Sequence, residues 1–454
     1  MTKKPVNQSR RTFMQASAVA GAGFWAAGGV APKKSLAANE EISFACIGVG
    51  GKGSSDSDDA GRNGNVVAIC DIDDETLGKA GEKFQGAKKY NDFRKMLEEM
   101  GDSIDGVTVS TPDHTHAVAA SMVMKMGKAC FCQKPLTHSL WEARELTKIA
   151  RETGVPTQMG NQGTAESNLR KSAALVGKNK VIGDVKEIHV WTNRPVWPQA
   201  YGLKPKTEPA PSHVHWDLWL GPASKHEYSP EIHPFKWRGF WDFGTGALGD
   251  MACHTLNMSY QALHLADPTS VAAESDRHDG ICYPKWSKIV YEFPEKDGRP
   301  ACKMIWYDGG QLPPAELMDQ LPKQQDGSHF TSGALLIGDK GMFYSPGDYG
   351  GETRYTGTIV DGEWTPIRKL ECDDYVKSPG HFVEFANAIK ENKIEAAMSN
   401  IQNYSGGLTE TVLLGNLAVW SGKKVEWDAE NLTAKGADDL DKIIKPEFHN
   451  GYSM

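Results

Sequence analysis

Residues 42–53 read Ile-Ser-Phe-Ala-Cys-Ile-Gly-Val-Gly-Gly-Lys-Gly, an apolar run that passes directly into a glycine-rich turn. The strand predicted over 42–49 leads into a G-x-G-x-x-G pattern formed by Gly48, Gly50 and Gly53, with Gly51 inside it. Such glycines allow a tight turn, close approach of the backbone to a pyrophosphate, and close packing of helix on strand. The free N–H groups at the start of the following helix favour bound phosphates. These four glycines are therefore predicted to form the phosphate-binding turn of a dinucleotide-binding domain.

A carboxylate follows the next predicted strand, residues 66–70. Asp71 lies eighteen residues beyond Gly53, where a carboxylate can accept hydrogen bonds from both ribose hydroxyls of a dinucleotide. The same carboxylate repels a 2′-phosphate, so the sequence favours NAD over NADP. The alternative is a glycine-rich turn followed by an unrelated helix-capping Asp within residues 71–74, and the spacing and strand context argue against it.

Short apolar runs alternate with amphipathic stretches of helical length from residue 42 to about residue 159. This alternation is typical of a parallel sheet with helices on both faces. We therefore expect an α/β Rossmann domain over residues 38–162. Its predicted strands are 42–49, 66–70, 106–110, 129–132 and 156–159, and its predicted helices are 76–84, 93–100, 115–126 and 139–153.

The pattern changes after Gly163, where longer strand-like runs alternate with turn-rich segments containing Pro, Gly and Trp. This is typical of an antiparallel sheet. Residues 163–454 are therefore predicted to form an α+β substrate-binding domain with a large, open, mostly antiparallel sheet. Its clearest strands are 187–193, 288–293 and 302–307, and two helices, 381–391 and 408–421, are expected to pack back against the body of the protein.

Three further motifs carry a family resemblance. They are Thr-Pro-Asp-His-Thr-His at 111–116, Gln-Lys-Pro at 133–135 and Gly-Ala-Leu-Gly-Asp-Met-Ala-Cys-His at 246–254. In this order, behind a G-x-G-x-x-G strand, they resemble the glucose-fructose oxidoreductase, inositol dehydrogenase and rhizopine-catabolism (Gfo/Idh/MocA) family. The resemblance covers essentially the whole chain after residue 37 and implies an NAD(P)-dependent oxidoreductase.

The resemblance implies three catalytic residues: the lysine of the family's E-K-P motif matches Lys134, and its D-x-x-x-H pair matches Asp250 and His254. Oxidation of a secondary alcohol needs a base for the hydroxyl proton, and a His with a pKa near the working pH suits this task. Asp250 and His254 are four residues apart, so on a helix they share a face, and the carboxylate can orient the imidazole or contact the substrate. The Lys134 ammonium, at the end of a parallel strand, can stabilise a developing alkoxide. Each motif alone is more often a surface feature, but together, behind a phosphate-binding turn, they favour catalysis.

One residue departs from the family pattern, because Gln133 stands where the family usually has Glu. An amide forms hydrogen bonds without bringing a charge, so a role that depends on a carboxylate at this position is in doubt. The other cofactor contacts predicted from the motifs and strand ends are Thr111, Pro112, His116, Gln133, Lys134 and Asn161.

The second domain is rich in Trp and Arg. Aromatic rings stack on the apolar faces of sugars, and Arg forms hydrogen bonds with hydroxyls or carboxylates. Most of these tryptophans are expected in the core, and Arg194, Trp237 and Arg238 are the predicted substrate contacts. The formal net charge of −8 gives no basic surface for nucleic acid or for an anionic membrane. A small neutral carbohydrate fits better.

Neither a disulfide framework nor a metal site is expected. The eight cysteines are scattered and form no C-x-x-C pair, and several lie in apolar strand-like runs where a free thiol behaves as a small hydrophobe. His213, His215 and His233 match no zinc spacing, and hydride transfer needs no metal.

The first 37 residues are predicted to be a twin-arginine export signal rather than part of the fold. Arg10 and Arg11 precede a weakly apolar run, 16–30, that is too short to span a bilayer. Ser35 and Ala37 supply the small residues of a cleavage site. The alternative is a basic tail without an export role. We expect a periplasmic or extracellular protein without a membrane span.

Export leads to a hypothesis about turnover, because free nicotinamide cofactor is not expected outside the cytoplasm. The cofactor would be bound before export, stay bound and be regenerated within each cycle, in an oxidoreductase acting on a secondary hydroxyl of a sugar, cyclitol or glycoside. One alternative is an NAD-dependent, redox-neutral glycoside hydrolase or lyase, and another is a non-catalytic sugar-binding protein. The open sheet favours a homodimer or homotetramer.

Overall fold

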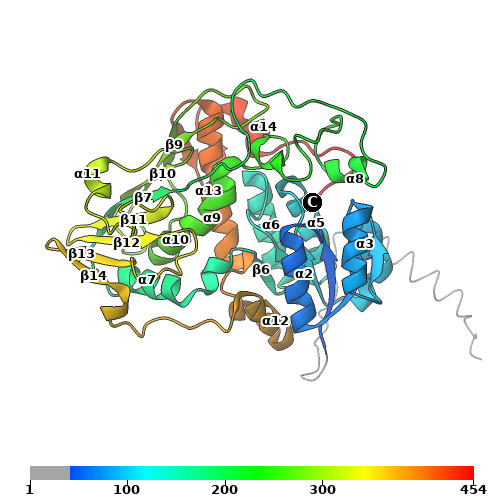
Figure 1. The fold of residues 1–454 in the computed structure, drawn as a ribbon, viewed down its shortest axis with the longest axis horizontal. Helices are drawn as coiled ribbons and strands as arrows, with labels where there is room; N and C mark the ends of the chain where they lie inside the picture. Colours follow the sequence, from blue (N-terminus) through cyan, green and yellow to red (C-terminus); the bar gives the residue numbers. More distant parts are fainter. Residues whose placement is uncertain (1–40) are drawn as a thin grey trace, which may run out of the picture.

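The computed structural model describes residues 41–454, which form two sheets placed side by side (Figure 1). One has six strands and belongs to the N-terminal part of the chain, and the other has ten strands. The expected fold class is confirmed: an N-terminal Rossmann domain with a parallel sheet precedes a C-terminal domain with a mostly antiparallel sheet. The predicted export signal at residues 1–37 lies outside the described residues.

The first sheet has the strand order β3-β2-β1-β4-β5-β6, and all its pairs are parallel. In a doubly wound sheet ligands bind where the order reverses, outside the carboxyl ends of the strands. Here the reversal lies between β1 and β4, so the loops that follow these two strands meet at one site. The strands are β1 (Ser43–Ile47), β2 (Asn65–Cys70), β3 (Lys88–Tyr90), β4 (Gly106–Val109), β5 (Ala129–Cys132) and β6 (Thr157–Met159). The helices are α2 (Lys52–Asn63), α3 (Asp74–Lys83), α4 (Phe93–Met100), α5 (Asp113–Lys125) and α6 (Leu140–Thr153).

Local sequence explains these elements, with one exception. Helix α6 begins at a capping box formed by Ser139 and Glu142 and ends at Gly154, which has the left-handed conformation that favours glycine. The sequence analysis missed strand β3. Its residues, Lys-Lys-Tyr, lie at the edge of the sheet and none is fully buried, so no apolar run marks the strand.

The second sheet has the order β14-β13-β12-β11-β7-β10-β9-β8-β15-β16. Its pairs are antiparallel except that of β7 with β10. The strands are β7 (Val185–Trp191), β8 (Ser270–Ser275), β9 (Ser287–Phe293), β10 (Cys302–Tyr307), β11 (Gly333–Gly338), β12 (Met342–Pro346), β13 (Gly357–Val360), β14 (Glu363–Pro366), β15 (Val425–Asp428) and β16 (Thr433–Ala434). The helices of this part are α7 (Ser167–Gly177), α8 (Trp216–Leu220), α9 (Gly246–Thr255), α10 (Asn257–Leu263), α11 (Ala315–Met318), α12 (His381–Glu391), α13 (Gly406–Ser421) and α14 (Asp441–Ile444).

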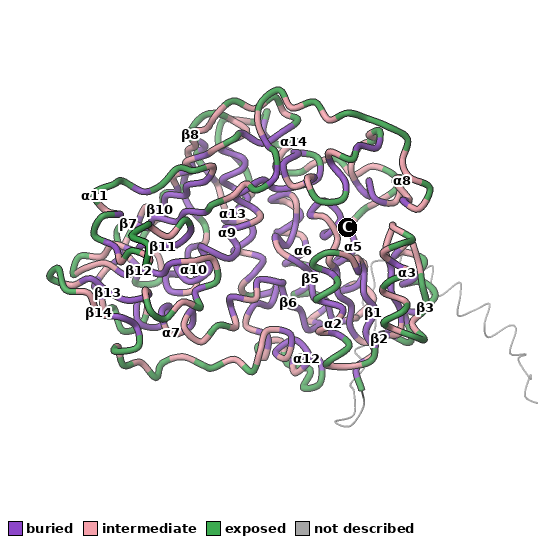
Figure 2. Tube along the Cα trace, viewed as in Figure 1, coloured by how far each residue is buried: buried purple, intermediate pink, exposed green. Residues whose placement is uncertain are grey.

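Two helices from late in the chain connect the sheets. Helix α13 packs against α6 of the first domain and against α9 and β8 of the second, where the chain is almost entirely buried (Figure 2). Helix α12 lies below the first sheet in Figure 1 and places Phe382 and Phe385 on Phe44 of β1, with ring centroids 5.7 and 6.3 Å apart. Residues far apart in sequence therefore complete the core of the Rossmann domain.

Candidate active site

A cleft of about 720 Å³ runs from the glycine-rich turn to helix α9 and is lined by residues of both domains. Most of the predicted site residues meet there. Those that line the cleft are Gly48, Gly50, Gly51, Asp71, Thr111, Pro112, Gln133, Lys134, Arg194, Trp237, Arg238, Asp250 and His254.

The glycine-rich turn shows two uses of glycine. Gly48 has φ +76°, and a Cβ on it would lie 2.6 Å from the Ser110 carbonyl oxygen, so the turn after β1 sits directly on the turn after β4. A Cβ on Gly53 would overlap the Gly48 carbonyl, so Gly53 serves the packing of α2 rather than the cleft. Helix α2 has no side-chain cap and no acidic residue in its first turn, and its positive end is open toward the cleft.

Asp71 follows β2 and points at the glycine-rich turn. Its carboxylate accepts the N–H of Val49 at 2.9 Å and the N–H of Asp73 at 3.0 Å. Burial raises the pKa of this carboxyl, and the two backbone hydrogen bonds offset part of the effect. Because the group lies at the carboxyl end of β2 beside an open helix N-terminus, the residues present fit a bound dinucleotide.

An ion pair joins the two domains at the centre of the cleft. Lys134 Nζ, after β5, donates to Asp250 Oδ1 at 2.8 Å and to the Asp250 carbonyl at 2.7 Å. Arg238 Nε lies 3.4 Å from the same Oδ1. Burial by itself raises the pKa of Asp250, but Lys134 and Arg238 outweigh it and hold the pKa below its usual range. The carboxylate is therefore ionised and bound by two cations.

His254 lies one turn after Asp250 on α9, and the Asp250 carboxylate binds Lys134 rather than this imidazole. The ring packs edge-on against Tyr349, with centroids 4.8 Å apart, and its Nδ1 is buried without a hydrogen-bond partner among residues 41–454. Burial lowers the pKa of His254 well below its usual range, and the Lys134 ammonium lowers it further, although Asp250 acts in the opposite direction. At neutral pH the ring is therefore uncharged and able to accept a proton.

Asp113 is a cleft residue that the sequence analysis quoted in a motif without assigning it a role. It is buried at the start of α5 and accepts the Thr245 hydroxyl at 2.7 Å. Burial raises its pKa to about 6, although Thr245, Arg238 and Lys134 each act to lower it. The cleft thus contains two carboxylates beside two cations, and one carboxylate titrates close to neutrality.

Asp113→Asn is expected to stabilise the protein at high pH. The folded pKa of about 6 lies above the value of about 3.9 in an unfolded chain, so the free energy of unfolding decreases as the pH rises from 4 to 6 and then stays low. Asn keeps an oxygen for the Thr245 hydroxyl and removes the buried charge. We expect a gain of up to about 3 kcal/mol at pH 8 and under about 1 kcal/mol at pH 4, by thermal or urea unfolding.

The exposed Asp102→Asn is the control, because its carboxyl is not buried and its removal should leave the pH profile of unfolding unchanged. An Asp113→Asn variant with the same gain at both pH values would contradict a buried charge at this position.

Two predicted cofactor contacts do not reach the cleft. His116 is buried, and its ring nitrogens lie 2.8 Å from the Pro135 carbonyl oxygen and 2.7 Å from the Thr111 carbonyl oxygen, so neither remains for a ligand. Its place is to hold together the loops after β4 and β5. Asn161 is fully buried and accepts the Ser399 hydroxyl, beneath the cleft rather than in it. These positions differ from the prediction because a motif shows proximity along the chain and not which way a side chain turns.

A segment of the second domain, residues 211–222, crosses over the first domain near Asp71, and we call it the strap. The Asp74 N–H donates to the His213 carbonyl and the His215 N–H donates to the Ile72 carbonyl, both at 2.9 Å. The His213 and His215 side chains lie 3.2 and 3.1 Å from the Asp73 and Asp74 carboxylates. These histidines therefore fasten the strap. Within residues 41–454, no group of three or more His, Cys, Asp or Glu side chains is placed to hold a metal ion.

The last residues of the chain, 446–454, return to the same end of the cleft, and we call them the tail (Figure 1). The Asn450 side chain donates to the Gly221 carbonyl of the strap at 2.9 Å. The Tyr452 ring lies 6.1 Å from the Phe93 ring and 4.5 Å from the Arg94 guanidinium, and it lines the cleft. Sequence analysis identified neither strap nor tail, since only tertiary structure brings them to Asp71.

The opposite end of the cleft has an aromatic wall. The Arg238 guanidinium lies over the rings of Trp237 and Phe235, 4.2 and 4.8 Å from their centroids, and Trp197 is 5.9 Å away. Arg194 lines the same part of the cleft. Apolar rings beside guanidinium and carboxylate groups suit a polyhydroxylated ring.

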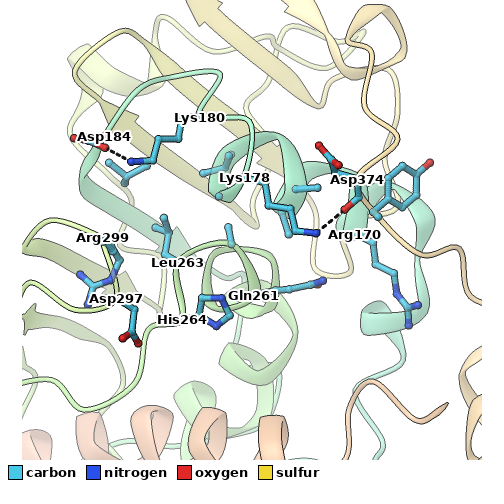
Figure 3. Close-up of a pocket in the computed structure, with 18 of the residues that line it drawn as sticks. Arg170, Lys178, Lys180, Asp184, Gln261, Leu263, His264, Asp297, Arg299 and Asp374 are labelled. Atoms are coloured by element: carbon cyan, nitrogen blue, oxygen red, sulfur yellow. Dashed lines mark hydrogen bonds and ion pairs between the residues drawn. The ribbon is translucent and has the colours of Figure 1, made fainter. Parts of the chain in front are cut away.

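A second cavity, of about 490 Å³, lies away from these groups between the ends of α7 and α10 (Figure 3). Its charges are largely matched within the protein: Lys178 donates to the Asp374 carbonyl at 3.0 Å, and Lys180 pairs with Asp184 at 2.9 Å. We therefore place the candidate active site in the larger cleft. No helix within residues 41–454 is long and apolar enough to cross a membrane.

Comparison with known proteins points to one family of enzymes. A model described as "Oxidoreductase family, NAD-binding Rossmann fold" matches residues 42–161, and one described as "Oxidoreductase family, C-terminal alpha/beta domain" matches 172–313; together they cover more than half of the chain.

Individual relatives agree with the family models. D-apiose dehydrogenase of Paraburkholderia graminis is 33% identical over 119 residues, which are 26% of this chain and 30% of that protein. scyllo-Inositol 2-dehydrogenase (NAD(+)) of Bacillus subtilis is 32% identical over 118 residues, 24% and 34% of the two chains. The chain thus spans about a third of the length of these curated relatives. The structure of an inositol dehydrogenase homolog from Azotobacter vinelandii, in complex with NADH and myo-inositol, has a TM-score of 0.55 at 16% identity and covers 87% of this chain and all of that chain.

Proposed function

We propose, on the premise that this chain belongs to the Gfo/Idh/MocA oxidoreductase family, that it oxidises a secondary hydroxyl of a sugar, cyclitol or glycoside with a nicotinamide cofactor. The observation that carries the proposal is the 2.8 Å contact between Lys134 and Asp250, which joins the two domains in one cleft with His254 beside it. The relatives named as dehydrogenases of D-apiose and scyllo-inositol support a polyol substrate.

The three residues divide the proton chemistry among them. The uncharged His254 accepts the proton of the substrate hydroxyl, for which a base is needed. The Lys134 ammonium stabilises negative charge that develops on the substrate oxygen. Asp250 stays ionised and holds the ammonium in place. Bound NAD would supply the hydride acceptor.

The same cleft has the groups that would hold this cofactor. Gly48, Gly50, Gly51 and the open end of α2 suit the pyrophosphate, and Asp71 suits the ribose hydroxyls. A carboxylate at this position disfavours a 2′-phosphate, so we propose NAD rather than NADP.

We further propose that the cofactor stays bound and is regenerated within each cycle. Two features support this: the strap is fastened to residues 72–74, and the tail is anchored to the strap with Tyr452 at the Phe93 end of the cleft. Both must open before a nucleotide leaves from this end. Retention suits the twin-arginine signal proposed for residues 1–37, since that route carries a folded protein away from the cytoplasmic pool of NAD.

The test is to denature the protein, purified from the compartment to which its own signal directs it, and to identify the released nucleotide by mass and absorbance. We expect close to one NAD(H) per chain, no NADP(H), and retention through dialysis. Tyr452→Ala removes the aromatic contact of the tail, so release should be about three- to tenfold faster.

Tyr201→Ala is the matched control, because Tyr201 is half exposed and does not line the cleft. Protein that emerges without nucleotide and requires millimolar NAD would contradict retention, while protein that binds no NAD at all would contradict the proposed activity as well.

A further inference from the structure

A buried carboxylate lies beneath the cleft with no part in the proton chemistry above. Asp56, one turn into α2, has 1% of its side chain exposed. Its Oδ2 accepts the Ser110 hydroxyl at 2.7 Å and the Gln133 amide at 2.8 Å, and its Oδ1 pairs with the half-exposed Lys52. Asp56 thus connects the helix after the phosphate turn with the ends of β4 and β5.

Gln133 uses both ends of its amide. While Nε2 donates to Asp56, Oε1 accepts the backbone N–H of Lys134 at 3.3 Å. Gly160 of the next strand end confines the group, since a Cβ there would lie 2.5 Å from the Gln133 Cδ. A glutamate at this position would have no N–H for Asp56 and no room to turn away, so two carboxylates would face each other in a buried site.

We propose that Asp56 is a positioning residue that fixes the Gln133 side chain, and through it the backbone of Lys134, and that it is the reason why position 133 carries an amide. The negative charge beneath the cleft is held on α2 instead of on β5. The departure of Gln133 from the glutamate of the family is then compensated within this chain.

Few titratable groups face Asp56. Lys52 lies on its own helix, and the thiols of Cys46 on β1 and Cys132 on β5 sense its charge. Burial raises the pKa of both thiols, that of Cys46 to about 11, so they stay neutral in the range tested below. A pH effect that appears only when residue 133 becomes an acid therefore belongs to the pair of residues 56 and 133.

Gln133→Glu is expected to create a proton-sharing pair. Two close carboxylates do not both ionise readily, so the folded variant holds a proton more tightly than the unfolded chain does. Its stability relative to the wild type should therefore be near normal at pH 5 and fall as the pH rises to 8, as measured by melting temperature. The ratio of its kcat/KM to that of the wild type should decrease at least about tenfold between pH 6 and 8, corresponding to a pKa raised by a unit or more.

The exchange variant Asp56→Asn/Gln133→Glu separates pairing from simple damage. The amide introduced at position 56 can donate to the new carboxylate at position 133 and accept the Ser110 hydroxyl. The pH-dependent deficit should therefore disappear, and kcat/KM should return to within about threefold of the wild type. Gln85→Glu adds the same charge at an exposed position of the first domain and is the control.

The inference is overturned if Gln133→Glu matches the wild type at every pH, or if the exchange variant keeps the deficit of the single variant. Should Gln133→Glu fail to fold, recovery of folded protein by the exchange supports the pairing, and failure of both contradicts it. The kinetic part rests on the proposed function, whereas the melting profiles do not, so the two can fail separately.

Discussion

Lys134→Met is expected to lower kcat by about 10²- to 10³-fold, because it removes the only cation that contacts both the Asp250 carboxylate and the Asp250 carbonyl within residues 41–454. The side chain of Met resembles that of Lys in length but cannot stabilise charge on the substrate oxygen. The measurement is reduction of NAD by the best substrate from a panel of sugars, cyclitols and glycosides, at saturating substrate.

Loss of Lys134 also leaves a buried carboxylate with only Arg238 beside it, and an unpaired buried charge destabilises. The double variant Lys134→Met/Asp250→Asn removes that charge, so we expect it to regain melting temperature without regaining kcat. Lys148→Met, on an exposed side chain of α6, is the control. A Lys134→Met enzyme with more than about a tenth of the wild-type kcat would exclude the proposed role of this ammonium.

His254→Asn is expected to lower kcat by about 10²- to 10⁴-fold, the range associated with a positioned acid or base. Because burial depresses its pKa, the neutral and reactive form exists throughout pH 6–8 and is lost only when the pH falls well below 6.5. NMR of protein labelled at the histidine ring carbons should therefore find His254 unprotonated at pH 6.

His264→Asn is the matched control for this variant, since His264 is exposed in a left-handed conformation that Asn tolerates and does not line the cleft. A His254 ring that titrates at its ordinary pKa, or a variant with nearly normal kcat, would remove this residue from the proposed chemistry.

Strong periodic signals explain what could be predicted of the fold. The helix 93–100 matches α4 because its apolar residues share one face, and strand 129–132 matches β5 because all four residues are buried. Strand β3 and the shorter strands of the second sheet escaped because neither a continuous apolar run nor a long alternation marks them.

The candidate site divides in the same way. Lys134, Asp250 and Asp71 could be predicted because they follow strands or occupy a motif whose position in the fold is fixed. Asp56 and Tyr452 could not, because their importance depends on contacts with residues 77 and more than 350 positions away, for which a single sequence gives no local signal.

Helix α12 determines when this protein can be complete during its synthesis. Phe382 and Phe385 cover Phe44 and Phe131, which belong to the first sheet. A ribosome that has made only the first domain therefore presents a chain whose aromatic surface is still bare. We expect this nascent chain to bind chaperones until residue 391 has emerged, and the Rossmann domain to acquire its final stability only near the end of translation.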